Sequence, residues 1–143
     1  MDSKVCFMAN KEKSKSKRNK VSDHLIWIGD SGASAHMTNV WEGFCKVKEE
    51  NSKAIFAQAD TTAPVKWSGD WRCIQQYYEN GNKKGGVGDK ITLNDVLFVP
   101  TLRQNLYSIT KEIANGGILT NDGNILMLKF KNHSICFDYK IMF

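Results

Sequence analysis

An apolar run that ends in a single acid constrains this chain more than any other stretch. Residues 25–28 are apolar, and Asp30 follows them after one glycine. Four small residues come next: Ser31, Gly32, Ala33 and Ser34. Glycine permits backbone angles that are closed to other residues, and a serine hydroxyl can bond locally to fix a turn. The pattern predicts a strand that ends in a sharp turn and holds one carboxylate rigidly at its end.

Three interpretations of this stretch are open on its residues alone. The first is an ordinary Asx or Ser turn between two strands. The second makes Ser31 a nucleophile, but serine proteases with such a sequence need a His and an Asp upstream and two full barrels. Only 30 residues precede Ser31, and many of them are charged. The third makes Asp30 a carboxylate of the aspartic-protease type.

Length and composition indicate one ordinary domain with a tail. The chain has 143 residues, of which 41% are hydrophobic and 24% charged, as in soluble globular proteins. No apolar run approaches the roughly 20 residues that span a bilayer. The first residues lack the apolar segment of a signal peptide. We therefore expect a cytoplasmic protein with no membrane partner.

The potential metal ligands are scattered along the chain. The cysteines and histidines are Cys6, Cys45, Cys73, Cys136, His24, His36 and His133. No cysteine pair has the short spacing of a zinc site, and in a reducing compartment the thiols stay free. We expect no metal and no cofactor.

The most basic segment lies near the N-terminus. Residues 11–20 carry six basic side chains and no apolar one, and with Glu12 counted their net charge is +5, the value of the whole chain. Such a segment buries too little surface to offset its ordering entropy. We predict a disordered basic linker over residues 1–23 and a folded domain over 24–143. A weak RNA or DNA contact through residues 11–20 is the second interpretation, which we favour less because no aromatic residue interleaves the charges.

Short strands separated by turn signals fill the rest of the chain. The predicted strands are residues 24–29, 54–57, 65–67, 71–78, 91–99, 118–119, 125–130 and 135–137. The segments 54–57 and 65–67 form a hairpin, and Asn80-Gly81 signals another. Trp41, Phe44 and Val47 are apolar points in a mixed loop.

One segment has helical periodicity. Leu102, Leu106, Ile109 and Ile113 are spaced by 4, 3 and 4, which predicts one short helix near residues 103–115. Many short strands with a single helix predict an all-β domain, either a small barrel or a sandwich.

Three blocks of the chain, in order, resemble the protease segment of copia-type (pseudoviral) retrotransposon Pol polyproteins. Residues 27–38 carry Asp-Ser-Gly-Ala-Ser followed by His-Met-Thr. Residues 59–69 carry Ala-Asp, Pro-Val-Lys and Gly in sequence, and residues 93–109 carry Leu-Asn-Asp-Val-Leu-Phe-Val-Pro-Thr-Leu and then Asn-Leu-Tyr-Ser-Ile. The likeness covers about residues 24–140.

The resemblance implies a small closed β-barrel of the retropepsin type, active as a homodimer with one Asp per chain. Asp30 is then catalytic, and residues 31–34 support its loop. The flap over the substrate is implied at Gln58, Ala59, Asp60, Thr61 and Thr62. The helix that begins near residue 105 packs behind the catalytic loop. The implied substrate is a polyprotein peptide. Within the cytoplasm, the resemblance adds virus-like particles as an expected location.

Two positions depart from that family. This chain has Asp60-Thr61 where the family has Asp-Gly, and Trp67-Ser68-Gly69 where it often has Gly-x-Gly. Both changes remove glycine near the implied flap. We therefore carry two hypotheses, a self-processing aspartic endopeptidase and a catalytically silent β-barrel binding module of the same polyprotein.

Four further residues attract attention for their chemistry. We expect a structural role for His36 and core positions for Trp67 and Trp71. Asp95 precedes an apolar run but lacks a following Ser/Thr-Gly, so we interpret it as a turn or strand-edge residue rather than a second catalytic acid.

Overall fold

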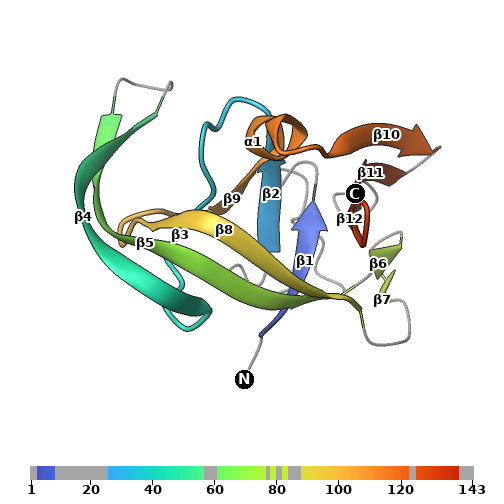
Figure 1. Ribbon diagram of the computed structural model, residues 1–143, viewed down its shortest axis with the longest axis horizontal. Coiled ribbons are helices and arrows are strands. Elements are labelled where there is room, and N and C mark those ends of the chain that lie inside the picture. Colours follow the sequence, from blue (N-terminus) through green and yellow to red (C-terminus); the bar gives the residue numbers. More distant parts are fainter. Residues whose placement is uncertain are drawn as a thin grey trace.

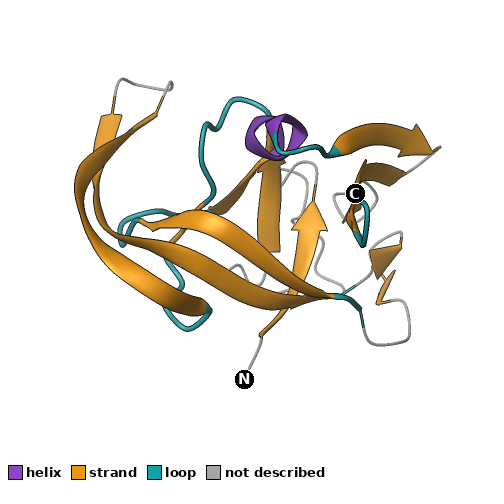
Figure 2. Ribbon diagram, viewed as in Figure 1, coloured by secondary structure: helices purple, strands orange, loops and turns teal. Residues whose placement is uncertain are grey.

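The computed structural model of the chain describes residues 3–8, 26–56, 61–76, 78–79, 82–83, 88–122 and 125–138. Strands dominate these residues, with a single short helix among them (Figures 1 and 2). The strands are β1 (Ser3–Met8), β2 (Ile26–Asp30), β3 (Met37–Thr38), β4 (Phe44–Phe56), β5 (Thr61–Gln75), β6 (Tyr78–Glu79), β7 (Asn82–Lys83), β8 (Lys90–Phe98), β9 (Asn105–Ser108), β10 (Ile118–Asp122), β11 (Ile125–Lys129) and β12 (Ser134–Asp138). The helix is α1 (Ile109–Ala114), and no described helix is long and apolar enough to cross a membrane.

Ten of these strands form one sheet. Their order is β10-β11-β12-β1-β2-β9-β3-β8-β5-β4, and β1 pairs in addition with β5. Strand β2 lies between β1 and β9 and is parallel to both. The predicted all-β class is therefore confirmed, as are the separate strands at residues 118–122, 125–129 and 134–138. Strands β6 and β7 pair antiparallel on either side of the predicted Asn80-Gly81 hairpin, whose own two residues lie outside the described ones.

The first strand corrects the predicted boundary at residue 24. Residues 3–8 form β1 in the middle of the sheet, and Val5 and Phe7 are each only 1% exposed. The linker prediction is wrong for these residues, because a short apolar stretch beside a charged run still finds three partner strands, β12, β2 and β5. The basic residues 11–20 lie outside the described residues.

Large aromatic side chains fill the main core. Trp27 and Trp71 are fully buried, with ring centroids 4.9 Å apart. The rings of Phe7, Tyr107 and Phe137 pack edge to face beside them at centroid distances of 5.4–6.0 Å. These rings come from strands β1, β2, β5, β9 and β12, so the core joins segments from the whole length of the chain. The core position of Trp71 is confirmed.

The helix is shorter than its periodicity predicts. Strand β9 occupies residues 105–108, and α1 begins only at Ile109. Leu102 and Leu106 pack on a second apolar cluster with residues such as Val65 and Val99, whereas Ile113 is 45% exposed. The 4-3-4 spacing therefore does not mark one helical face. Pairing of β9 with β2 and β3 overrides the local helical preference.

The predicted hairpin is present but much longer than expected. Strands β4 and β5 run antiparallel from Phe44↔Trp71 to Phe56↔Thr61, so part of the predicted mixed loop at 41–47 belongs to β4. Figure 1 shows this hairpin as the long curved ribbon at one side of the molecule. Residues 61–64, predicted as part of its turn, are also strand.

Two bulges bend the sheet, one in each of the strands β4 and β8 that flank β5. Lys46 in β4 and Asp95 in β8 both have a φ of 52°, and the register shifts beside each of them. Gly69 of β5 lies between them, where an added Cβ would come within 3.0 Å of the Lys46 carbonyl oxygen. Bulges increase local twist and bend the strand that carries them. The bend therefore depends on a glycine at position 69.

Candidate functional site

Asp30 is the last residue of β2, at the point where the chain leaves the sheet. Its side chain is partly buried, and its Oδ1 accepts a hydrogen bond of 2.8 Å from the backbone N–H of Gly32. The N–H of Ala33 lies 3.4 Å from the Asp30 carbonyl oxygen, which closes the turn. A Cβ at Gly32 would lie 3.3 Å from Oδ1, so a side chain there would crowd the carboxylate. The strand-then-turn prediction is confirmed.

Solvent reaches the loop on one side only. Ser31, Gly32 and Ser34 are exposed, whereas Ala33 is buried at 7% exposure. The loop therefore packs through Ala33 and leaves the residues beside the carboxylate open. That arrangement suits a carboxylate that acts on a molecule from outside.

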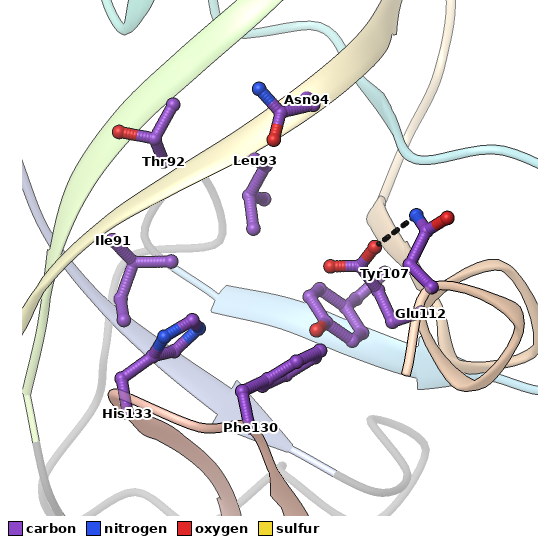
Figure 3. A pocket seen from close by; sticks show the side chains of 9 residues that line it. Ile91, Thr92, Leu93, Asn94, Tyr107, Glu112, Phe130 and His133 are labelled. Carbon is purple, nitrogen blue, oxygen red and sulfur yellow. Dashed lines mark hydrogen bonds between the residues drawn. The ribbon is translucent and has the colours of Figure 1, made fainter. Parts of the chain in front are cut away.

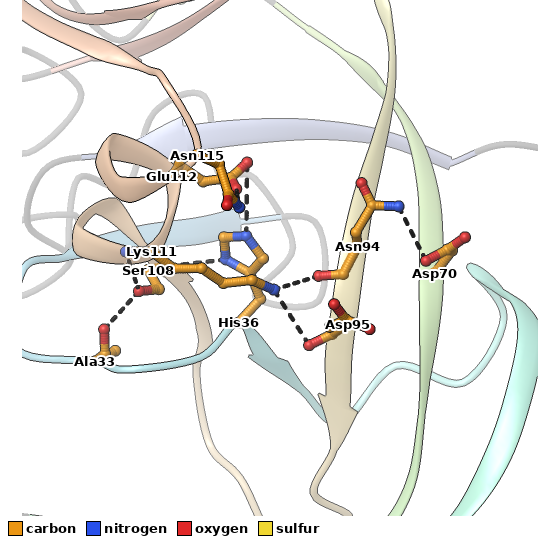
Figure 4. Close-up of polar contacts among 9 residues, drawn as sticks. All are labelled: Ala33, His36, Asp70, Asn94, Asp95, Ser108, Lys111, Glu112 and Asn115. Atoms are coloured by element: carbon orange, nitrogen blue, oxygen red, sulfur yellow. Dashed lines mark hydrogen bonds and ion pairs between the residues drawn. The ribbon is translucent and has the colours of Figure 1, made fainter.

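Ser108 ties this loop to the helix behind it. Its Oγ donates to the Ala33 carbonyl oxygen at 2.5 Å and accepts from the Lys111 N–H at 3.1 Å as the N-cap of α1. Thr110 adds a second tie, from its Oγ1 to the Ser31 carbonyl oxygen at 2.6 Å. The Ala33 and Ser31 carbonyls thus accept from hydroxyls at the start of α1, and Figure 4 shows the first of these bonds.

His36 holds the far end of the loop from inside the protein. The side chain is fully buried, and its Nδ1 accepts a 2.8 Å hydrogen bond from the Ser108 N–H. Its Nε2 faces Glu112 Oε2 at 3.9 Å, and its ring lies 4.6 Å from that of Tyr107. Burial lowers the pKa of His36 below its ordinary value. A neutral ring with Nδ1 as acceptor is a structural support, in agreement with the role expected for it.

A second buried network fixes β3 against β9 and β2. Thr38 Oγ1 donates to Asn105 Oδ1 at 2.6 Å, and Asn105 Nδ2 donates to the Ile26 carbonyl oxygen at 2.9 Å. Thr38 Oγ1 also accepts from the Val40 N–H at 3.0 Å. Both side chains are at most 2% exposed. They hold in place the two strands from which the Asp30 loop leaves and to which it returns.

Charged groups connect α1 to β8 at the edge of this site. Lys111 Nζ donates to the backbone carbonyls of Asn94 and Asp95, the second at 3.4 Å. Burial lowers the pKa of Lys111. Burial also acts to raise the pKa of Glu112, but the contacts with His36 and Asn115 outweigh it and hold that pKa below its usual range. Glu112 is therefore an ionised carboxylate just behind the loop.

Asp95 does not lie at a turn or at the end of a strand. It is an exposed residue inside β8, at the bulge with positive φ. The aspartate is tolerated there because Asp adopts left-handed backbone angles more readily than most residues. The interpretation of Asp95 as a turn or strand-edge residue is corrected to a bulge residue.

Only part of the implied flap can be placed. Thr61 and Thr62 are exposed at the start of β5, paired with Phe56 and Ile55 of β4. Gln58, Ala59 and Asp60 lie outside the described residues.

Four aromatic rings gather at the surface beside the hairpin. Trp41 is 44% exposed, and its ring centroid lies 5.6 Å from Phe44, 6.0 Å from Trp67 and 5.2 Å from Phe98. Trp67 is only partly buried, so its predicted core position is wrong. We call these four residues the surface aromatic cluster.

No group of three His, Cys, Asp or Glu side chains that suits a metal ion occurs among the described residues. Cys45 and Cys136 are free thiols. Sequence reasoning singled out Asp30 and its loop but gave no role to Ser108, Thr110 or Asn105. The N-cap preference for serine just before an apolar helical turn is the one signal that points to Ser108.

The chain matches the protein family described as Pol polyprotein, beta-barrel domain, over residues 27–117. No curated protein and no solved structure matches it. The matched segment runs from β2 to the residue before β10, so it contains Asp30, the hairpin, β9 and α1 and covers more than half of the 143 residues. This chain therefore belongs to the Pol polyprotein beta-barrel domain family.

Proposed function

We propose that this domain is an aspartic endopeptidase of a copia-type retrotransposon Pol polyprotein and processes that polyprotein as a homodimer. One observation carries the proposal. The Asp30 carboxylate is held at the end of a central strand, beside exposed Ser31 and Gly32, by a loop that the buried Ser108 hydroxyl and the exposed Thr110 hydroxyl fix from behind. An ordinary connecting turn has no need of so many long-range supports.

The chemistry requires a second carboxylate. Peptide hydrolysis of this type needs one group to take a proton from water and another to protonate the scissile carbonyl. Two close carboxylates share one proton and perform both tasks. The sequence contains a single Asp-Ser-Gly, so the second Asp30 comes from another copy of the chain across a two-fold axis.

A retropepsin-like closed barrel is the finer fold that goes with this function. The pairing of β1 supports it. Residues 6–8 of β1 pair with β2 and residues 3–5 pair with β5, so the series β1-β2-β9-β3-β8-β5 returns to β1. A closed arrangement of strands gives the Asp30 loop a rigid base. The β4–β5 hairpin supplies the flap over the substrate.

The test compares cleavage by the chain fused to its flanking polyprotein sequence with cleavage by two variants. Asp30→Asn removes the acid and keeps the shape, and we expect at least a roughly hundredfold loss of cleavage. Asp95→Asn is the matched control, because asparagine also adopts positive φ and Asp95 is exposed in β8. Equal cleavage by the wild type and Asp30→Asn would end the proposal.

Oligomeric state gives an independent check. Sedimentation at increasing protein concentration should reveal a dimer, and a statine-type transition-state mimic should shift the equilibrium toward it. A chain that stays monomeric at every concentration cannot assemble the pair of carboxylates. Such a result, with no cleavage, would favour the second candidate.

The second candidate is a catalytically silent binding module of the same polyprotein. The surface aromatic cluster favours it, because Trp41 stays 44% exposed although three other rings surround it. Exposed aromatic side chains are enriched where proteins bind partners. Replacing Trp41 by Ser should leave cleavage intact if the domain is a protease and abolish partner binding if it is a module.

A further inference from the structure

A cavity lies beside α1 and is lined by none of the residues 30–34 of the Asp30 loop. Its volume is about 270 Å³, and it opens between β8, α1 and the β11–β12 turn. Figure 3 shows its walls, with Ile91 and Leu93 of β8 facing Tyr107, Phe130 and His133. Exposed Thr92 and Asn94 also line it, so its mouth lies at the surface.

The cavity holds a buried hydroxyl with no partner in the described part of the chain. Tyr107 is fully buried, and its hydroxyl makes no hydrogen bond of normal geometry there. Burial and the nearby Glu112 carboxylate raise the pKa of this hydroxyl, so the two groups face the same space. In Figure 3 the hydroxyl points into the cavity between Ile91, Phe130 and His133. A buried hydroxyl without a partner costs free energy, so native proteins rarely leave one. A bound group that reaches this oxygen would remove the penalty.

The same cavity holds an anion that is only partly compensated. Glu112 Oε1 accepts from Asn115 Nδ2 at 3.0 Å, while Oε2 faces a neutral His36 across 3.9 Å. Lys111 directs its ammonium to the backbone carbonyls of Asn94 and Asp95 instead. The Glu112 carboxylate therefore has room for a cationic donor. Contacts with its neighbours keep its pKa low, so it stays charged at neutral pH.

Flat aromatic faces complete the cavity. The rings of Phe130 and His133 stack with centroids 4.7 Å apart and an interplanar angle of 15°. A planar cation that donates several N–H groups to a carboxylate also stacks well on aromatic faces, which describes a guanidinium better than an ammonium. Asn94 adds an amide to the lining.

We propose that this cavity is a binding site for an alkylguanidinium group, with Glu112 as its carboxylate, Tyr107 as a buried hydroxyl partner and Phe130–His133 as its aromatic wall. The group is the side chain of free arginine or of an arginine in a peptide. The site is separate from the Asp30 loop and does not depend on the proposed proteolysis.

The experiment titrates the full chain with L-arginine and follows the backbone amides of β8, α1 and the β11–β12 turn by NMR. We expect saturable shifts confined to those elements. L-citrulline has nearly the same shape without the charge, and we expect it to bind at least roughly tenfold more weakly. Absence of saturable shifts, or equal binding of citrulline, would overturn the proposal.

Two variants make the test specific. Glu112→Gln should weaken arginine binding roughly tenfold or more, because the charged partner is lost. Tyr107→Phe should weaken it by about threefold to tenfold without lowering the stability of the free protein, because the deleted hydroxyl has no partner among the described residues. Glu49→Gln on the exposed face of β4 is the matched control and should leave binding unchanged. Unchanged affinity in Glu112→Gln would overturn the assignment.

A final titration distinguishes the two sources of the guanidinium group, free arginine and an arginine within a peptide. N-acetyl-L-arginine N-methylamide presents the same side chain within a peptide-like backbone. Binding equal to that of arginine identifies an arginine side chain of a peptide, and binding of free arginine alone identifies the amino acid. Failure of both compounds contradicts the site.

Discussion

The loop after Asp30 and the β4–β5 hairpin both lie beside the proposed active site, but different forces fix their shapes. Side chains from distant parts of the chain hold the loop, since His36 and Ser108 are 72 residues apart and Ala33 and Ser108 are 75 apart. Residues 61–65 of the hairpin pair with β4 alone, and the side-chain bond from Ser68 to Glu50 joins residues only 18 apart.

The Asp30 loop and the β4–β5 hairpin also differ in how deeply their polar side chains are buried. The residues that support the loop, His36, Thr38, Asn105 and Ser108, are between 0% and 2% exposed. Most residues of β4 between 46 and 53 are exposed. A buried polar group that loses its partner costs far more than an exposed one, because water cannot replace the bond. The loop should therefore be sensitive to single polar substitutions, whereas the hairpin should tolerate them and keep freedom to move.

The largest effect is expected at Asn105. Its replacement by Ala leaves the Thr38 hydroxyl and the Ile26 carbonyl without this partner, and we expect a loss of about 3 kcal/mol in the free energy of unfolding. Urea unfolding measures it. Asn94→Ala is the control, because its bond to Asp70 is exposed, and it should cost less than about 0.5 kcal/mol. Equal losses in the two variants would remove the distinction between buried and exposed support.

Ser108 should come next. Ser108→Ala removes the N-cap of α1 and the bond to the Ala33 carbonyl together, with an expected loss of about 2 kcal/mol. Thr110→Ala removes only an exposed bond to the Ser31 carbonyl, so it should cost about 0.5 kcal/mol. Thermal unfolding of both variants checks the order. If the domain is a protease, Ser108→Ala should also reduce cleavage, because the Asp30 loop loses an anchor.

The pH dependence of stability tests His36 directly. Burial lowers its pKa from the ordinary value of 6.5, so below pH 6.5 the unfolded chain binds a proton that the folded protein still refuses. The free energy of unfolding should therefore fall as the pH drops from 6.5 toward the pKa of His36 in the folded protein. Above pH 6.5 the ring is neutral in both states, and no stability is lost through His36. The pKa of Glu112 is also lowered, so this residue reduces the free energy of unfolding only when the pH falls below its ordinary pKa of 4.5. Urea unfolding across this range measures the slope.

His36→Gln should flatten the slope just below pH 6.5, whatever its effect on stability at neutral pH. His133→Gln is the control, because that ring is only partly buried and stacks on Phe130 away from the Ser108 and Glu112 contacts of His36. A slope that survives in His36→Gln would mean that another group is responsible.

The same comparison explains which parts of the fold the sequence predicts. Strand β8 and the strands at 118–138 combine alternating apolar residues with nearby turn signals, and such local patterns are sufficient. Strand β1 was missed, because its burial depends on β12, β2 and β5, which lie far along the chain. Residues 105–108 look helical by spacing, but parallel pairing with β2 makes them strand. Long-range pairing cannot be read from local patterns.

The candidate site divides in the same way. The position of Asp30 at a strand end followed from a local pattern of apolar and small residues. The supports at Ser108 and Asn105 did not, because they act on residues more than 60 positions away. Those residues lay within the blocks that carried the resemblance, but no local chemistry assigned them a role.

A small effect is expected in the hairpin, at Ser68. Its Oγ donates to Glu50 Oε1 at 2.9 Å across the β4–β5 pair, beside the second register shift of β4. Ser68→Ala should lower the free energy of unfolding by only about 0.5 kcal/mol, because water can reach the part-buried partner. Faster amide hydrogen exchange at residues 61–68, with exchange at β2 and β9 unchanged, would show that the hairpin opens without disturbing the loop. A loss of protection in β2 as well would mean that the two regions unfold together, and the contrast between them would then fail.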